Sequence, residues 1–383
     1  MTAGDRFTVD HDFPGGNIIV ENIEGDTVFL RQDLRDTEGH WFYWAFRVRG
    51  AEGRTLRFEF VDGDVIGARG PAVSVDDGLS FRHLGLDGVE GDGFRYTFGA
   101  TDRAVRFAVA IPYLGADFDA FLDEAAPASR GGDSTLRVRT LCASEGGRAV
   151  PVVHCGGDTA GYKVLLTGRH HSCESLASFS LEGFLRAAVA RDRLGEWFRE
   201  NVQILAVPFV DIDGVEDGDQ GKNRRPHDYN RDYGQESIYR SVRALKELIP
   251  RWSAGVLTIT LDLHCPYLKG GNSSEDIHFV GSPEPDNWAR TMEFCDTLEE
   301  VQRGPLRYSQ TSNIPYGAAW NVGKTGIAES CSRWMGTQET IHFGTTIEIP
   351  YATACGVEVN PATARALGRD LARAVRAYLV DRV

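Results

Sequence analysis

Two different hydrophobic patterns divide the chain of 383 residues. From Asn17 to about Tyr113, short runs rich in aromatic and β-branched residues are separated by turn residues. The run 55–60 alternates polar and apolar positions with period two, which is typical of a strand that is wet on one face. Many short strands and no long helical pattern predict an antiparallel β-sandwich domain over residues 1–112.

After residue 112 the pattern changes to apolar strands that alternate with longer helical stretches. This alternation predicts an α/β layered domain over residues 113–383. The predicted strands are 163–167, 202–209, 256–263 and 345–349, and the predicted helices are 176–190, 237–252, 287–301 and 361–379. Asn360 and Pro361 are the residue types that favour the N-cap and first turn of the last helix.

The composition changes this picture mainly by exclusion. The chain is 42% hydrophobic and 25% charged, and it lacks the run of about 18 apolar residues that a membrane helix needs. A formal net charge of −14 repels phosphate backbones and anionic lipid, so we expect neither a nucleic-acid nor a membrane partner. The N-terminal residues lack a secretory apolar core, and the seven cysteines are scattered without a C-x-x-C spacing. We therefore expect a cytoplasmic protein with free thiols.

Candidate metal ligands stand where predicted strands end. His171 and Glu174 follow one strand, and a His and a Glu three residues apart on a turn can bind one metal ion together, although such spacing also arises on ordinary surfaces. His264 ends another strand at the same edge, where open α/β sheets bind ligands; a lone His there can equally be a hydrogen-bonded core residue. Two histidines and one glutamate with an open fourth position form a catalytic zinc set.

Two further segments carry charged side chains that chemistry could use. Strand alternation places Glu348 and Thr346 on one side of an otherwise apolar strand, where a buried carboxylate either has a role or pairs with an arginine. The long polar segment 211–231 is of the kind that is functional, or else a solvated or calcium-binding loop. Its guanidinium groups can bind carboxylates or stabilise a developing oxyanion.

These four pieces, in this order, resemble the zinc carboxypeptidases of the carboxypeptidase A type, from about Leu114 to the end of the chain. Segments 118–122 and 144–150 resemble the opening helix and first hairpin of that family. The resemblance implies a mixed, mainly parallel sheet with helices on both faces. Four N-terminal segments are similar to the β-sandwich that precedes the catalytic domain in cytosolic carboxypeptidases, and this places the chain in that branch or in a bacterial relative; they are 16–17, 40–43, 70–71 and 107–113.

The resemblance implies one zinc ion per chain, with His171, Glu174 and His264 as its ligands. Glu348 would be the general base that activates water. Asp228, the first residue of a D-x-N-R motif, would hydrogen-bond an imidazole that binds the zinc.

The same motif implies that Asn230 and Arg231 hold the terminal carboxylate of the substrate. An arginine that stabilises the oxyanion falls within segment 222–225, and we choose Arg224, with Arg225 as a further residue for substrate binding.

The sequence departs from the family in one place. The family usually has a tyrosine about 20 residues before the catalytic glutamate, but no tyrosine lies between Tyr316 and Glu348. Tyr316 is the candidate replacement from another loop. Lys324 and Arg333 are candidates for recognising an acidic side chain, or are ordinary surface cations.

We therefore predict a zinc metallocarboxypeptidase that hydrolyses the C-terminal amide bond of a peptide or protein, with a preference for acidic residues as a finer expectation. Two alternatives stay open. One is a zinc amidohydrolase that removes the acyl group from N-acyl amino acids, and the other is a zinc-containing protein that binds peptides without cleaving them.

Overall fold

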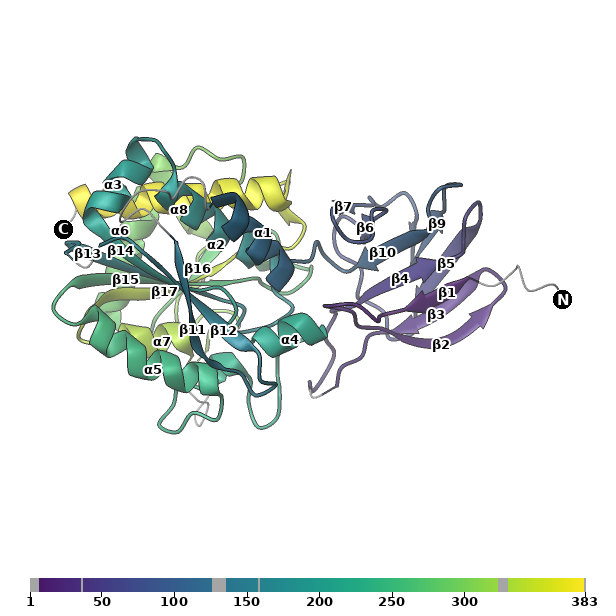
Figure 1. The fold of residues 1–383 in the computed structure, drawn as a ribbon, viewed down its shortest axis with the longest axis horizontal. Helices are drawn as coiled ribbons and strands as arrows, with labels where there is room; N and C mark the ends of the chain where they lie inside the picture. The colour runs from purple at the N-terminus through teal and green to yellow at the C-terminus, as the bar shows by residue number, and fades with distance from the viewer. Residues whose placement is uncertain (1–6, 36, 126–135, 158, 323–329, 382–383) are drawn as a thin grey trace.

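The computed structural model describes residues 7–35, 37–125, 136–157, 159–322 and 330–381. N-terminal strands form one side of the molecule, and helices surround a larger sheet on the other side (Figure 1). Within the described ranges, none of the helices combines the length and the apolar character needed to cross a bilayer.

Two five-stranded sheets make up the N-terminal part. Their strands are β1 (Thr8–Asp10), β2 (Ile19–Glu24), β3 (Thr27–Arg31), β4 (Ala45–Arg49), β5 (Thr55–Phe60), β6 (Ala72–Ser74), β7 (Arg82–His83), β8 (Val89–Glu90), β9 (Gly93–Thr97) and β10 (Ala104–Ala108). The sheet orders are β1-β4-β10-β6-β7 and β2-β3-β5-β9-β8. Phe46 on β4 contacts Phe58 on β5 with ring centroids 5.1 Å apart, and Phe107 on β10 contacts Phe94 on β9 at 5.3 Å. The two sheets therefore share an aromatic core.

One pair of strands departs from the antiparallel pattern that the sequence predicts for this part. β3 and β5 run parallel to each other, with Val28 opposite Phe58. The strand between them in the sequence, β4, belongs to the other sheet. The chain crosses to that sheet and returns in the same direction, which is the kind of connection that parallel neighbours require.

A seven-stranded sheet lies at the centre of the C-terminal part, in the order β11-β12-β14-β13-β15-β17-β16. The strands are β11 (Arg137–Ala143), β12 (Ala149–Cys155), β13 (Tyr162–Gly168), β14 (Val202–Val207), β15 (Leu257–His264), β16 (His278–Val280) and β17 (Ile341–Glu348), and a separate two-stranded ribbon pairs β18 (Thr353–Ala354) with β19 (Val357–Glu358). The four central strands are parallel, whereas β11, β12 and β16 pair in the antiparallel sense. The sheet is mixed, as the resemblance implies.

Helices cover both faces of this sheet (Figure 1). They are α1 (Gly115–Ala125), α2 (Ser175–Val189), α3 (Arg193–Asn201), α4 (Ile212–Asp217), α5 (Arg240–Ser253), α6 (Pro285–Val301), α7 (Cys331–Gly336) and α8 (Pro361–Asp381). Alternation along β13 divides the core, because Leu165 packs with Leu245 of α5 while Val164 packs in the cluster that contains α2 and α8.

The helices and strands predicted for this part are present, with shifted ends. Helix α5 begins at Arg240 rather than Ser237, because the Asp232 carboxylate accepts hydrogen bonds from the N–H groups of Ile238 and Tyr239 at 2.8 and 2.9 Å and holds them outside the helix. The polar segment 211–231 contains helix α4, which the hydrophobic pattern does not reveal.

Helix α2 begins directly after Glu174 and is held by close packing against α8. A side chain is excluded where the two helices meet, because a Cβ on Gly368 of α8 would lie 1.9 Å from the carbonyl oxygen of Ser180. A Cβ on Gly183 of α2 would lie 2.2 Å from the carbonyl oxygen of Arg365. Glycine at these two positions fixes the distance between the helices, and with it the start of α2.

We predict that Gly368→Ala lowers the free energy of unfolding by about 1–3 kcal/mol, because the added methyl group overpacks a backbone contact. Urea denaturation followed by circular dichroism measures the loss. Gly161→Ala is the matched control, since a Cβ there meets open space, and it should leave the midpoint nearly unchanged. Equal midpoints for the two variants would contradict the close packing of α2 and α8.

Candidate metal centre

The parallel strands bring three chemically active segments to one edge of the central sheet. β13 ends at Gly168, β15 at His264 and β17 at Glu348. Gly168 lies opposite Leu263, and His264 lies opposite Glu348. The turn that carries His171 and Glu174 therefore starts beside the strand ends that carry the other two residues.

Arg169 shapes this turn. Its backbone φ of +59° lies in the left-handed region, and its buried guanidinium donates hydrogen bonds to the carbonyl oxygens of Ser172 at 3.0 Å and Tyr113 at 2.7 Å. These contacts reverse the chain after β13 and direct it into α2. His171 and Glu174 are thereby presented on the same side.

The side chains of His171, Glu174 and His264 converge, and all three are buried. The Nδ1 atom of His171 lies 2.9 Å from Glu174 Oε1, and the Nδ1 atom of His264 lies 2.8 Å from Glu174 Oε2. The two Nδ1 atoms are 3.2 Å apart. Burial raises the pKa of Glu174, but Lys222 and the two imidazoles outweigh this effect and hold the pKa well below its ordinary value.

The hydrogen bonds on the far side of His264 fix its tautomer. Its Nε2 atom lies 2.8 Å from Asp262 Oδ2, so the Nε2–H group donates a hydrogen bond to that carboxylate. Asp262 is buried, and its other oxygen accepts from the Thr167 hydroxyl at 2.7 Å. In the neutral imidazole the Nδ1 atom then carries a lone pair, and this lone pair faces the Glu174 carboxylate.

This donor set is suited to a divalent metal ion. Two lone-pair nitrogens and a carboxylate at such short distances repel one another unless a cation or shared protons lie between them. Zinc bound at roughly 2.0–2.2 Å by nitrogen and oxygen would sit among ligand atoms separated by about 3 Å, which agrees with the spacings found here. His171, Glu174 and His264 are therefore the residues that would hold the ion.

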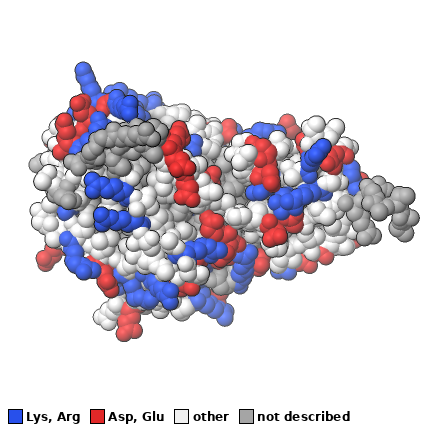
Figure 2. Space-filling model, viewed as in Figure 1, with Lys and Arg blue, Asp and Glu red and all other residues white. Residues whose placement is uncertain are grey.

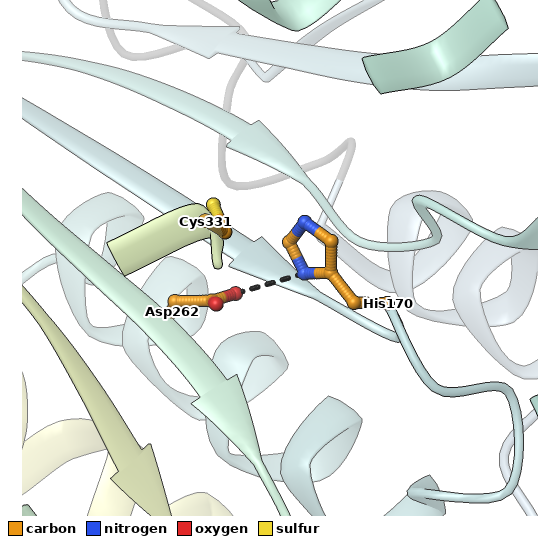
Figure 3. Close-up of side chains that lie close together, drawn as sticks. All are labelled: His170, Asp262 and Cys331. Atoms are coloured by element: carbon orange, nitrogen blue, oxygen red, sulfur yellow. Dashed lines mark ion pairs between the residues drawn. The ribbon is translucent and has the colours of Figure 1, made fainter. Parts of the chain in front are cut away.

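Asp262 also contacts a second imidazole. His170 Nδ1 lies 3.0 Å from Asp262 Oδ1, and Cys331 completes a buried group of three potential ligands (Figure 3). Burial raises the pKa of the Cys331 thiol well above its ordinary value, so the thiol keeps its proton. His170 Nε2 is already 2.8 Å from the hydroxyl of Tyr233. This group is better explained as a hydrogen-bonded support behind His264 than as a second metal site.

Glu348 stands next to the cluster. It is 8% exposed, and its Oε2 atom has no hydrogen-bond partner among the described residues. Leaving a buried carboxylate oxygen unpaired costs roughly 1–3 kcal/mol or more, which makes such an atom unusual in a part of the chain with no further role.

The D-x-N-R motif lies on the other side of His171. Asp228 Oδ1 is 3.6 Å from His171 Nε2, and Asp228 Oδ2 accepts from the N–H of Asn223 at 3.1 Å. The buried side chain of Asn230 accepts from the N–H of Cys331 at 3.0 Å through its oxygen. Arg231 is half-buried beside them. The motif therefore joins the cluster to helix α7.

Comparison with known proteins identifies the fold. No protein-family model and no curated protein sequence matches the chain. Among solved structures, a metallo-carboxypeptidase from Burkholderia cenocepacia superposes with a TM-score of 0.79 and 18% identity, over 98% of this chain and 100% of that one. A metallo-carboxypeptidase from Pseudomonas aeruginosa in complex with (2-guanidinoethylmercapto)succinic acid gives a TM-score of 0.76 and 19% identity, over 97% of this chain and 99% of that one. The chain has the metallo-carboxypeptidase fold.

The three cationic side chains of segment 222–225 lie in different surroundings. Arg224 is buried and forms two ion pairs, to Asp211 at 2.7 Å and to Asp219 at 2.6 Å. The side chain of Arg225 is 81% exposed and pairs with Glu38 at the surface. Neither contact involves the metal cluster.

Lys222 is the cation of this segment that contacts the cluster. Its Nζ atom lies 2.6 Å from Glu174 Oε1, and its side chain is only 14% exposed. Burial lowers the pKa of Lys222. The attraction of Glu174 together with that of neighbouring groups outweighs burial, so the pKa lies above its ordinary value. Lys222 therefore stays charged beside the candidate ligands.

Tyr316 lies against Arg333 of helix α7. The Arg333 guanidinium carbon is 5.1 Å from the centre of the Tyr316 ring, which is 41% exposed. The neighbouring Ser332 accepts a hydrogen bond from Thr346 at 2.8 Å, and Thr346 shares a face of β17 with Glu348. Lys324 lies outside the described residues.

Sequence reasoning missed two groups here. Asp262 stands two residues before His264 on a strand, so both side chains point to one side, and this spacing was a usable signal. The ring of Trp41 from the N-terminal part lies 5.4 Å from Lys222 Nζ, and no local pattern predicts that long-range contact.

Basic and acidic side chains are interspersed over the face shown in Figure 2, so their charges largely compensate each other locally.

We predict that zinc raises the melting temperature of the metal-free protein by roughly 5 °C or more, because the ion binds only the folded cluster. Thermal scans with zinc and with a chelator measure the difference. His264→Ala should abolish the zinc-dependent rise. His342→Ala, on the same sheet at the opposite end of β17, should keep it; an equal loss in both variants would place the ion elsewhere.

Proposed function

We propose that this chain is a zinc metallocarboxypeptidase that hydrolyses the C-terminal amide bond of a peptide or protein. One observation carries the proposal: His171, Glu174 and His264 converge beside the buried, unpaired oxygen of Glu348. Similarity to two solved metallo-carboxypeptidases over nearly their whole length supports it at the level of the fold.

In this mechanism His171, Glu174 and His264 hold the zinc ion, which when bound polarises a carbonyl and lowers the pKa of water toward about 7. Glu348 takes the proton of the attacking water and delivers it to the nitrogen of the leaving amine. Asp262 and Asp228 orient the two imidazoles from behind. The buried position of Glu348 keeps its free oxygen available for this transfer.

Asn230 and Arg231 are the proposed binding residues for the substrate's terminal carboxylate. A guanidinium matches a carboxylate in two parallel hydrogen bonds. The oxygen of Asn230 is held by the Cys331 N–H, which leaves its amide nitrogen to donate. Tyr316 is the proposed substitute for the missing tyrosine, since its ring is exposed next to Arg333.

A preference for acidic C-terminal residues is the finer proposal, and Arg333 supports it. Arg333 is half-buried and directly follows Ser332 in the sequence. Ser332 contacts the face of β17 that carries Glu348. The hydrogen bond from Arg333 to the side-chain oxygen of Asn321, at 3.4 Å, is long, so a carboxylate would be a stronger partner.

The two N-terminal sheets form, in this proposal, a β-sandwich domain over residues 1–112 that precedes a catalytic domain over residues 113–383. The shared aromatic core supports this division. The cytosolic branch of the family and a cytoplasmic location stay predictions.

We predict that Glu348→Gln lowers kcat by about 10²–10⁴-fold while KM and the zinc-dependent thermal shift stay within a few-fold of wild type, because only proton transfer is lost. Release of C-terminal residues is measured by mass spectrometry on free and amidated peptides and on N-acyl amino acids. Glu339→Gln, an exposed residue just before the same strand, is the control. Undiminished turnover in Glu348→Gln would remove the base from the mechanism, and cleavage confined to N-acyl amino acids would favour the amidohydrolase alternative.

We predict that Arg333→Gln lowers kcat/KM for peptides ending in Glu by about tenfold or more, the effect expected when a charged hydrogen bond is lost. Peptides ending in Leu serve as the internal control and should be cleaved at the wild-type rate. Arg333→Lys should keep part of the preference. A uniform loss on both peptides would show that Arg333 supports the fold of α7 and does not select the substrate.

A further inference from the structure

We propose that Lys222 is a catalytic residue, the cation that stabilises the carbonyl oxygen of the scissile amide as it becomes negative. This inference rests on the proposed function and assigns the role that the sequence places on Arg224. It depends on three features of the site: the position of the ammonium group, the contacts that hold its backbone, and the engagement of the neighbouring arginines.

The ammonium group of Lys222 lies where the reaction would take place. It is 2.6 Å from Glu174 Oε1, and Glu348 lies opposite His264 where β15 and β17 end. The ammonium group therefore lies beside a proposed metal ligand, at the sheet edge that also carries the proposed base. A cation already held beside the reacting groups stabilises developing negative charge with little reorganisation.

The backbone of Lys222 is fixed against the turn that carries the ligands. A Cβ on Gly221 would lie 2.2 Å from the backbone nitrogen of Ser172, so only glycine permits this approach. The carbonyl oxygen of Gln220 accepts from the N–H of Cys173 at 3.3 Å. The loop and the ligand turn thus form one unit.

The N-terminal part holds the same loop from the other side. The side chain of Gln220 exchanges two hydrogen bonds with the backbone of Tyr43, at 2.7 and 2.8 Å. The ring of Trp41 lies 5.4 Å from Lys222 Nζ, within the range of a cation–π interaction. These contacts limit the positions that the ammonium group can take.

Arg224 is engaged elsewhere. Moving its guanidinium to the cleft would leave Asp211 and Asp219 without their partner, and removing one member of a buried ion pair is strongly destabilising. Lys222 gives up a contact with Glu174, which the bound metal ion would neutralise in its place. The exchange is therefore far easier for Lys222.

The reaction is balanced with these groups. The water oxygen forms a bond to the carbonyl carbon, the π electron pair moves to the carbonyl oxygen, and Glu348 takes a proton from the water. The carbon–nitrogen bond then breaks, the electron pair returns from the oxygen, and the amine receives the proton from Glu348. Lys222 donates a hydrogen bond to the oxygen throughout and stays an ammonium.

The experiment compares Lys222→Met, Lys222→Gln and Lys222→Arg with the wild type in the zinc-loaded full chain. Four quantities are measured: kcat and KM on a free peptide, the affinity for a peptide whose scissile amide is replaced by a phosphinate, and the affinity for zinc by competition with a chelating dye. A phosphinate carries the negative oxygen that the amide lacks, so its binding reports the proposed role without turnover.

Both neutral variants should lose about 10²–10³-fold in kcat and a similar factor in phosphinate affinity, while KM changes little. Zinc affinity should stay equal or increase, because a competing cation has been removed from Glu174. Lys222→Arg should keep part of the kcat and part of the phosphinate affinity. Lys163→Met is the matched control, since Lys163 also lies over a tryptophan ring, at 5.5 Å from that of Trp252, but near the start of β13, at the opposite end from the site.

Neutral variants that keep kcat and phosphinate affinity within threefold of wild type would overturn the proposal and make Lys222 a simple counter-ion of Glu174. A loss that excess zinc restores would overturn it as well. If the wild type cleaves no peptide but binds the phosphinate in a Lys222-dependent way, the proposed function fails, and with it the catalytic role of Lys222, which is then a binding residue for a negatively charged ligand oxygen. If the wild type neither cleaves nor binds, both fail.

Discussion

The burial of charge at one edge of the central sheet is the constraint on which the site depends. Glu174, Asp262 and Glu348 lie there with three imidazoles and one ammonium, all of them largely removed from water. Uncompensated charge at such depth is costly, so each group must find a partner or a cation. The register of β13, β15 and β17 brings the groups together, and the packing of α2 on α8 holds the start of α2 in place. The fold therefore brings together buried carboxylates whose negative charge a divalent ion would neutralise.

Asp262 shows how the sheet prepares a ligand. Its two oxygens accept hydrogen bonds from Thr167 and His264, so the Nε2 proton of the His264 ring points away from the cluster, and His170 Nδ1 lies 3.0 Å from the same carboxylate. The Nδ1 atom is thereby aimed at Glu174, and in the neutral ring it offers its lone pair on that side. Because Thr167, Asp262 and His264 lie on strands β13 and β15, the orientation of the His264 ring is set by the sheet.

Much of this arrangement follows from local sequence. The strand endings at Gly168, His264 and Glu348, the H-x-x-E spacing and the amphipathic helices are all set by periodicity and turn chemistry, and the structure contains them. What local sequence does not contain is the choice among neighbouring cations. Arg224, Arg225 and Lys222 differ little as residue types, and their positions are decided by Asp211, Asp219, Glu38 and the N-terminal segment, which are distant in sequence or carry no motif.

The N-terminal part therefore contributes more than a cover for the aromatic core. Its segment 37–43 meets the loop 218–225 through the hydrogen bonds between Gln220 and Tyr43, the ion pair of Arg225 with Glu38 and the ring of Trp41 over Lys222. A loop with this many polar groups would be mobile if it were held from one side only. Contacts on both sides convert it into a fixed wall of the site. A preorganised cation near the metal ligands requires such a wall, because an ammonium group on a flexible loop would lose in conformational entropy much of what it gains by charge stabilisation.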